Sequence, residues 1–392
     1  MQEIASSLQK RYPHLQFRQH WELSPDVRYQ LGQCDAIIRA IRETPLSPDH
    51  GRELRIVALK KGAQATTAIE GNTLTDEEVS RVAAGESLPP SKEYQEREVR
   101  NVIDAMNGIL TEVVEEDLIP PVSPGLMLSF HKRIGSELGE HFDAIPGQFR
   151  TDERFVGPYK CPRAADVRPL VDLFCEWHQR EFASKHESAT FADAVIQAIV
   201  THVYVEWIHP FGDGNGRTGR LLEFYLLLRA GNPDIASHIL SNFYNETRPA
   251  YYRQLHQANK NRDLSDFIAY AVEGYRDGLL ETLKRIQGIQ FRIAWRTLVY
   301  ERFAKQRYRK KGVFKRRRDL MLHFPLDKTV PIEVVPLHSI DLARKYSALT
   351  STTLLRDVNI LVDMGLVVPD QSVRGYRANT DLLRRRMPSR RP

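Results

Sequence analysis

The interpretation of this 392-residue chain depends on one stretch, His209-Pro-Phe-Gly-Asp-Gly-Asn-Gly-Arg-Thr-Gly-Arg220. Three of its glycines, Gly212, Gly214 and Gly216, fall within five residues and leave room for backbone N–H groups to approach an anion. An apolar segment of helical pattern follows directly, and the N-terminus of a helix attracts negative charge. The stretch therefore predicts a phosphate-binding loop at the start of a helix.

The polar side chains of this stretch indicate what the loop does with the phosphates. Asn215 can cap the helix or donate to a phosphate oxygen, and Arg217 and Arg220 lie on one side of its first turns. Asp213 would be repelled by phosphate unless a cation intervenes, and a Mg²⁺ shared by the carboxylate and phosphate oxygens resolves that conflict. His209, as a neutral imidazole, can take a proton from an incoming hydroxyl. In-line attack on phosphorus needs little else.

Outside this stretch the chain is predicted to be mainly α-helical. Ser24-Pro-Asp and Ser47-Pro-Asp each open a helix with a serine cap and a proline at the first position, and these helices run to about Glu43 and Ile69. The segment after Asn215 is apolar on nearly all faces, which predicts burial at the centre of a domain. A short helix is expected to open at Thr75, and further helices are expected at about 94–114, 123–138, 169–180, 190–208, 251–259 and 264–292. Residues 147–157 are bounded by glycines and predict a short hairpin or flap.

The stretch 209–220 resembles the full signature of the Fic family, with no departure at any defining position. The resemblance implies a helical Fic fold with a short β-hairpin flap. It also implies transfer of AMP from Mg-ATP to a Ser, Thr or Tyr hydroxyl of a target protein or of the enzyme itself. A Doc-type kinase relative has Lys at the position of Gly216, so the glycine favours adenylylation.

The same resemblance implies a role for each residue of the stretch. His209 is the base and Asp213 is the metal ligand. Arg220 faces the γ-phosphate. The other nucleotide contacts of the loop are Gly212, Gly214, Asn215, Gly216 and Arg217.

Two further segments resemble parts of the family. Phe155, Val156 and Gly157 match the flap, which holds the target peptide by strand addition beside the histidine. Tyr251-Tyr252, followed by Asn259, matches the nucleoside-binding stretch, although two adjacent tyrosines on a helix also suit ordinary packing.

Thr66-Thr-Ala-Ile-Glu70-Gly71 resembles the inhibitory motif of the family. It would place the protein in the class with an N-terminal inhibitory helix, known as class II. A carboxylate docked on Arg220 neutralises the guanidinium meant for the γ-phosphate and puts negative charge where that phosphate must go. ATP then binds only in a non-productive pose, so Glu70 is expected to hold the catalyst inactive.

Basic residues are concentrated towards the C-terminus. Residues 301–392 hold 21 Lys and Arg against 9 Asp and Glu, which leaves 35 against 41 for residues 1–300. A helix, a turn, a second helix and a strand pair follow residue 338 and outline a small winged helix-turn-helix domain. Arg356 on the second helix, with Arg374 and Arg377 near the wing, would face DNA. Residues 321–380 are balanced in charge, so a protein contact or a structural role is equally open.

These patterns divide the chain into four regions: 1–120, an N-terminal helical region with the inhibitory helix; 121–290, the catalytic core; 291–325, a basic helical connector; and 326–392, a winged-helix-like domain with an Arg-rich tail. The three cysteines fit neither a zinc motif nor a disulfide framework, so a cytoplasmic setting is expected. No apolar run predicts a membrane span. Homodimerisation is left open.

Two rival functions remain open from the sequence. The same scaffold could move UMP, phosphocholine or phosphate instead of AMP. Alternatively, the chain is a DNA-binding regulator in which the Fic site senses nucleotide or is vestigial.

Overall fold

The computed structural model describes residues 2–183, 191–307, 310–370 and 375–384. It divides into two compact units, with unit 1 covering Met1–Lys284 and unit 2 covering Arg285–Pro392. Each unit is described by itself. The fold of the described residues is mainly α-helical with two small antiparallel sheets, as the sequence predicts.

Unit 1 begins with helices that start at sequence-encoded caps. The Oγ of Ser24 accepts a hydrogen bond from the Val27 amide (3.2 Å), and Thr75 forms a capping box with Glu78. The two Ser-Pro-Asp helices run over the predicted residues, which confirms that prediction. The helices of this region are α1 (Gln2–Arg11), α2 (Pro25–Glu43), α3 (Pro48–Ile69), α4 (Asp76–Ala83) and α5 (Glu93–Leu110), the last continued by a π-turn at Thr111–Glu115.

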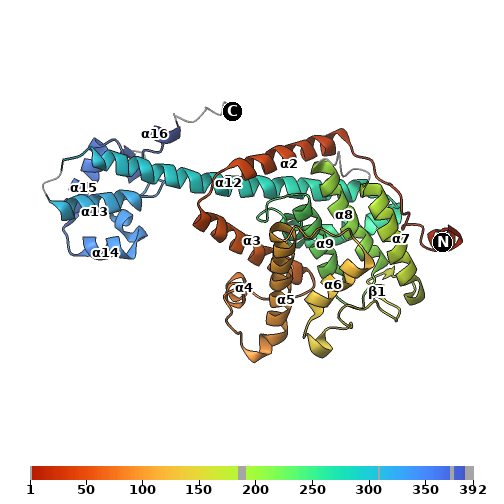
Figure 1. Cartoon of the computed structure of the whole chain (residues 1–392). Helices are drawn as coiled ribbons and strands as arrows, with labels where there is room; N and C mark the ends of the chain where they lie inside the picture. The colour runs from red at the N-terminus through yellow and green to blue at the C-terminus, as the bar shows by residue number, and fades with distance from the viewer. Residues whose placement is uncertain (1, 184–190, 308–309, 371–374, 385–392) are drawn as a thin grey trace. The chain divides into compact units, whose positions relative to one another are not determined.

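Two helices form the centre of unit 1. In Figure 1, α8 (Phe191–Ile208) and α9 (Asn215–Arg229) lie in the middle, with α5 and α6 (Pro124–Gly135) on one side and α7 (Ala164–Ala183) on the other. All of α9 from Asn215 to Leu228 is buried, as its apolar faces predict. The loop that joins α8 to α9 is therefore held in the core of the unit.

Helix α8 is, among the described residues, the single helix long and apolar enough to cross a membrane. Within this structure, 67% of that helix is buried inside the unit, as in the core helix of a globular domain.

The remaining helices of unit 1 are α10 (Ile239–Glu246), α11 (Arg248–Asn261) and the first half of α12 (Ser265–Ala304). Helix α10 was not predicted, because its N-cap residue His238 makes no side-chain cap that a pattern could reveal. Helix α12 is longer than predicted and continues into the basic region.

The flap lies later in the chain than expected. Strands β1 (Phe155–Val156) and β2 (Tyr159–Lys160) pair antiparallel, with Val156 opposite Tyr159. Gly157, at φ +55°, makes the left-handed turn between them. The prediction of a hairpin over 147–157 was therefore wrong in position, since residues 147–154 are irregular and the glycine that turns the chain is the second of the two.

Unit 2 has the order of elements that the sequence predicts. Helices α14 (Ile340–Ser347) and α15 (Ser351–Asp363) are followed by β3 (Val367–Asp370) and β4 (Gly375–Ala378), which pair antiparallel. They pack with the second half of α12, α13 (Lys311–Leu322), the 3₁₀-helix Ile332–His338 and α16 (Asp381–Arg384) around one apolar cluster. Arg374 and the Arg-rich tail from residue 385 lie outside the described residues, so the predicted roles of both stay predictions.

Candidate active site

The loop between α8 and α9 is closed by its own asparagine. The Asn215 amide donates to the Phe211 carbonyl and accepts from the Phe211 N–H, both at 2.9 Å. Gly214 has φ +77°, and a side chain at Gly212 would meet the Asp143 carbonyl at 2.3 Å. Both glycines are thus needed by the backbone. Because Phe211 uses both ends of the Asn215 amide, the predicted phosphate contact of that side chain stays a prediction.

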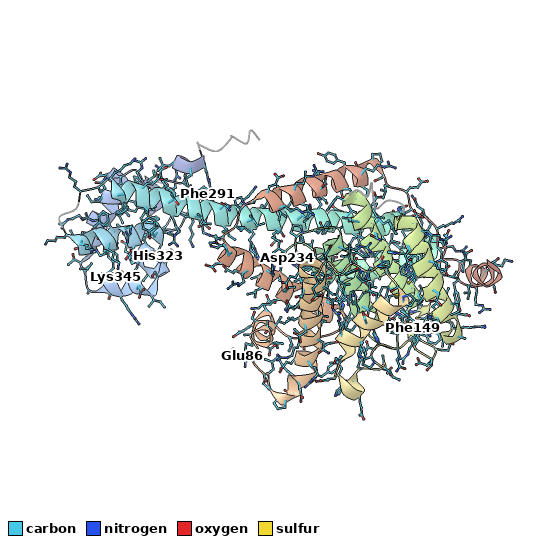
Figure 2. All side chains as sticks on the ribbon, viewed as in Figure 1. Glu86, Phe149, Asp234, Phe291, His323 and Lys345 are labelled. Atoms are coloured by element: carbon cyan, nitrogen blue, oxygen red, sulfur yellow. The ribbon has the colours of Figure 1, made fainter. Side chains whose placement is uncertain are left out.

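A buried histidine, His131 on α6, contacts two residues of the loop. His131 on α6 stacks on Phe211, with ring centroids 3.8 Å apart, and its Nδ1 accepts from the Gly147 N–H (3.0 Å). Its Nε2 therefore carries the proton and donates to the Asp213 carbonyl at 3.0 Å. Phe149, which is labelled in Figure 2, also stacks on Phe211, with ring centroids 5.7 Å apart. The predicted loop is thus held rigid by residues the sequence analysis did not single out.

His209 lies where α8 ends. Its backbone is in the left-handed region, with φ +47°, and its carbonyl accepts from Arg150 Nε at 2.7 Å. The Nδ1 atom is buried and has no hydrogen-bond partner in the structure. Burial, with repulsion from Arg150, lowers the pKa of the imidazole to about 4. The side chain is therefore neutral at pH 7, which is the form a general base needs.

Arg217 lies between two carboxylates. It donates to Glu98 and, at 2.7 Å, to Asp213 Oδ1, and its side chain is only 2% exposed. Glu98 on α5 also accepts from Asn72 Nδ2 at 2.9 Å. Burial raises the pKa of the Glu98 carboxyl in spite of the arginine. These side chains line a polar pocket of about 180 Å³ that is also bordered by Glu70.

The metal expectation rests on Asp213 alone. Among the described residues there is no group of three His, Cys, Asp or Glu side chains that could hold a metal ion. The Asp213 side chain is 31% exposed towards the pocket and has one oxygen beside Arg217. One carboxylate together with nucleotide oxygens is the ligand set typical of Mg²⁺ in nucleotide sites, so the residues fit a magnesium ion that arrives with ATP.

Glu70 and Arg220 form the ion pair that the inhibitory motif implies. Glu70 Oε1 accepts from Arg220 Nη2 at 2.5 Å, and the same nitrogen donates to the Thr66 carbonyl at 3.0 Å. Burial alone would raise the pKa of Glu70, but attraction to Arg220 outweighs it, and the pKa is lowered overall. A Cβ on Gly216 would lie 2.1 Å from Glu70 Oε1. The glycine therefore leaves the space that the carboxylate fills.

The two adjacent tyrosines on α11 have different surroundings. Tyr251 is 1% exposed and stacks on Tyr244, so it belongs to the core. Tyr252 is 44% exposed and donates to the Ile69 carbonyl at 3.2 Å, which places it next to the end of α3. Asn259, whose Nδ2 is buried without a partner, follows two turns later on the same helix. Contacts of the three with a nucleoside stay predictions.

The hairpin brings two apolar side chains to the surface. Phe155 is 65% exposed and Val156 is 42% exposed, while Gly157 makes the turn. Arg150 ties the chain on both sides of this hairpin to the loop, by donating to the carbonyls of Asp152 and Pro162. The flap is therefore attached to the same arginine that contacts His209.

The segment that contains this loop matches a known protein family. Residues 121–227 match the family profile described as the Fic/DOC family. The chain is 29% identical over 208 residues to protein adenylyltransferase fic-1 of Caenorhabditis elegans, covering 53% of this chain and 38% of that protein. It is 28% identical over 208 residues to protein adenylyltransferase Fic of Nematostella vectensis, covering 53% and 44%. The chain thus spans about two fifths of the length of the curated relatives it matches.

Solved structures show the same fold. A Fic family protein from Desulfovibrio desulfuricans G20 aligns with a TM-score of 0.55 and 21% identity, over 95% of this chain and all of that one. Fic-1 from Caenorhabditis elegans aligns with a TM-score of 0.53 and 22% identity, over 67% of this chain and 72% of that one. Residues 121–227 therefore form a Fic/DOC family domain.

Proposed function

We propose that this chain is a protein adenylyltransferase, which transfers AMP from ATP to a hydroxyl of a protein side chain. The observation that carries the proposal is a loop in the core that holds His209 and Asp213 and is followed directly by the buried Arg217 and Arg220 in the first turns of α9. The names of the curated relatives support the same reaction at family level. Gly216, where a kinase-like relative would have lysine, favours AMP over phosphate.

The proposed reaction uses each side chain for one task. The hydroxyl oxygen of the target attacks the α-phosphorus of ATP, a phosphorus–oxygen bond forms, and the bond to pyrophosphate breaks. His209, neutral at pH 7, accepts the hydroxyl proton. Arg217 and Arg220 neutralise charge on the phosphates. A Mg²⁺ bound by Asp213 would supply further charge neutralisation on the phosphate oxygens.

We infer that the state in this structure is the inhibited one. The Arg220 side chain is fully buried, and its Nη2 donates to Glu70 Oε1 and to the Thr66 carbonyl. Its Nε and Nη1 have no hydrogen-bond partner in the structure. The Glu70 carboxylate lies 2.5 Å from Arg220 Nη2. A γ-phosphate that approached this guanidinium would therefore come close to a second negative charge. Like charges at such a distance repel strongly in a buried site. Glu70 must therefore leave before ATP binds productively.

The test is incubation of the purified chain and of the Glu70→Gly variant with ATP labelled at the α-phosphate, with cell lysate as a source of targets. We expect label on protein to increase in the variant, because Arg220 is free to bind the γ-phosphate. His209→Ala in the same background is expected to abolish labelling while the fold is retained. Labelled UTP, CDP-choline and γ-labelled ATP are offered in parallel. Transfer from one of these alone would replace AMP transfer as the function.

A second candidate function concerns unit 2. Over its first two turns α15 exposes no acid: its exposed residues are Ser351, Thr352, Leu355, Arg356 and Asn359, all polar or basic except Leu355. We propose on this ground that α15 contacts DNA. A gel shift with the full chain and random duplex DNA is expected to show salt-sensitive binding that Arg356→Ala weakens, with Arg296→Ala on α12 as the exposed control. Equal binding by both variants would remove DNA as the partner of α15.

A further inference from the structure

Arg150 is a buried arginine outside the signature loop. It lies in the irregular segment before the hairpin and is only 6% exposed. Its guanidinium donates to three backbone carbonyls: Nε to His209 at 2.7 Å, Nη1 to Asp152 at 2.6 Å, and Nη2 to Pro162. Its own backbone N–H donates to the Pro210 carbonyl at 2.9 Å. One residue therefore joins the chain before the hairpin, the chain after it and the start of the catalytic loop.

Burial of the Arg150 guanidinium costs free energy, which indicates that this residue has a role beyond packing. A guanidinium taken out of water is unfavourable unless its N–H groups are all satisfied, and here the three hydrogen-bonded carbonyls are neutral. Burial accordingly lowers the pKa of Arg150. A packed apolar side chain would serve stability at least as well. The charge and the fork of donors must then serve something other than packing.

The backbone of His209 supplies the reason. A non-glycine residue at φ +47° is strained by about 1 kcal/mol or more, and it persists only where its surroundings fix it. The hydrogen bonds from Arg150 to the carbonyls of His209 and Pro210 fix both peptide groups that follow the histidine Cα. The backbone of Glu206 on α8 also faces the ring, so backbone groups on both sides of the histidine set the direction of the imidazole.

We propose that Arg150 is a positioning residue for His209, and that it sets the distance between the imidazole and a hydroxyl presented on the hairpin. The same guanidinium anchors Asp152 and Pro162 on either side of β1 and β2, so the hairpin and the base move as one piece. This inference rests on the proposed adenylyl transfer. It adds a residue outside the 209–220 loop to the machinery and assigns it to the acceptor side of the reaction.

A second consequence is electrostatic. Burial is the largest cause of the low pKa of His209, and Arg150 and Arg154 of the flap segment lower it further. The backbone of Glu206 and the carboxylate of Glu70, which follows α3, raise it. Removal of Glu70 takes away one of the two contributions that oppose the arginines. Arg150 therefore widens the pH range in which the imidazole is neutral.

The kinetic test compares Arg150→Met and Arg150→Lys in the Glu70→Gly background, with Arg168→Met as control because Arg168 is an exposed residue of α7 paired with Asp172. We expect Arg150→Met to lower kcat by about 10²-fold, as for a misplaced catalytic group, and to leave the KM for ATP unchanged. Arg150→Lys should recover the pH profile but only part of the rate. A rate loss with raised KM for ATP, or one shared by Arg168→Met, would overturn the proposal.

The structural test needs no activity. Side-chain NMR titration of the histidines is expected to give a higher pKa for His209 in Arg150→Met than in the parent, and a value near the parent in Arg150→Lys. An unchanged resonance of His178, which is buried elsewhere on α7, shows that the fold is intact. An unchanged His209 pKa in Arg150→Met contradicts the inference. If the Glu70→Gly protein transfers no AMP, the adenylyltransferase proposal is wrong, and this titration still tests the contact between Arg150 and His209.

Discussion

At the scale of single residues, the contact between Glu70 and Arg220 joins positions 150 apart in the chain. Two physical effects could make it inhibitory: the negative charge of the carboxylate and the volume it occupies above Gly216. A side chain at Gly216 would collide with Glu70 Oε1 at 2.1 Å, so the space is filled closely. The two effects are separated by a substitution that keeps the volume and removes the charge.

Glu70→Gln is expected to raise self-labelling by ATP above the wild type but below Glu70→Gly. The amide still fills the space next to Gly216, whereas its neutral oxygen no longer repels the γ-phosphate. The measurement is the initial rate of label incorporation at saturating ATP for the three proteins side by side. If Glu70→Gln is as inactive as the wild type, volume and not charge is what blocks the nucleotide.

The residue scale also shows what the sequence could and could not predict. His209, Asp213 and Arg220 were predicted because they stand together in one contiguous loop whose chemistry is local. Arg150, His131 and Glu98 were not, because their partners lie 59, 82 and 119 positions away. Nothing near them in the sequence marks them as different from any buried polar residue. Their roles depend on how α5, α6 and the flap segment pack on the loop.

At the scale of elements, the C-terminus of α3 is held by α11. Arg248 Nη1 donates to the Ala68 carbonyl at 3.3 Å, and the Tyr252 hydroxyl donates to the Ile69 carbonyl at 3.2 Å. The Ala68 carbonyl also accepts from the Gly71 N–H at 3.0 Å, so backbone and side-chain donors together close this last turn. The two donors fix the turn that carries Glu70.

Tyr252→Phe is therefore expected to loosen the end of α3 and raise the basal labelling rate by about 2- to 10-fold, the value of one hydrogen bond of 0.5–1.5 kcal/mol. The ring is retained, so any stacking on a nucleoside is preserved. Tyr29→Phe on α2 is the control, since Tyr29 is 70% exposed. The comparison is made at saturating ATP. A rate equal to that of the wild type would show that this hydrogen bond does not hold Glu70 in place.

In unit 2, α13 and α15 are joined by a buried carboxylate. The Asp357 side chain is 0% exposed and accepts from Arg316 (2.8 Å), Arg317 (2.6 Å) and the Tyr346 hydroxyl (3.0 Å). The strand pair and helix order of this unit were predictable from local patterns, whereas this network was not. It joins residues about 40 positions apart on different helices.

Asp357→Ala is expected to destabilise unit 2 by about 3 kcal/mol, at the low end for a broken buried ion pair because both arginines are partly exposed. Thermal unfolding of the full chain should then show unit 2 melting earlier, while unit 1 is unchanged. Asp363→Ala, an exposed position on the same helix, provides the matched control. Equal melting of the two variants would mean that the Asp357 network adds nothing to the stability of unit 2.

At the scale of the whole molecule, unit 1 buries neutral imidazoles far from the loop as well as in it. Burial lowers the pKa of His14 to about 4 and that of His178 to about 3, against 6.5 for a free side chain. His178 Nε2 bonds to the Thr201 hydroxyl at 2.9 Å, and that hydroxyl donates to the Gln197 carbonyl at 2.7 Å. Nε2 therefore carries the proton, and burial keeps the imidazole neutral at pH 7.

The sign of the resulting pH dependence follows from the two states. Below pH 6.5 the unfolded chain binds a proton at His178, whereas the folded chain does not until about pH 3. Stability is then lost as the pH falls, by about 2 kcal/mol per such histidine at pH 5. We expect the free energy of unfolding of unit 1 to decrease between pH 7 and pH 5, and His178→Gln to have a smaller decrease, even though it is less stable at pH 7.

Urea denaturation followed by tryptophan fluorescence measures this, because Trp21, Trp177 and Trp207 lie buried in unit 1. His256→Gln removes an exposed histidine of α11 and should leave the pH slope of the wild type unchanged. Parallel slopes for the wild type and His178→Gln would show that this imidazole is protonated equally in the folded and unfolded chains. Its burial among α7 and α8 would then carry no proton linkage, and the acid sensitivity of unit 1 would have to come from other buried histidines such as His14.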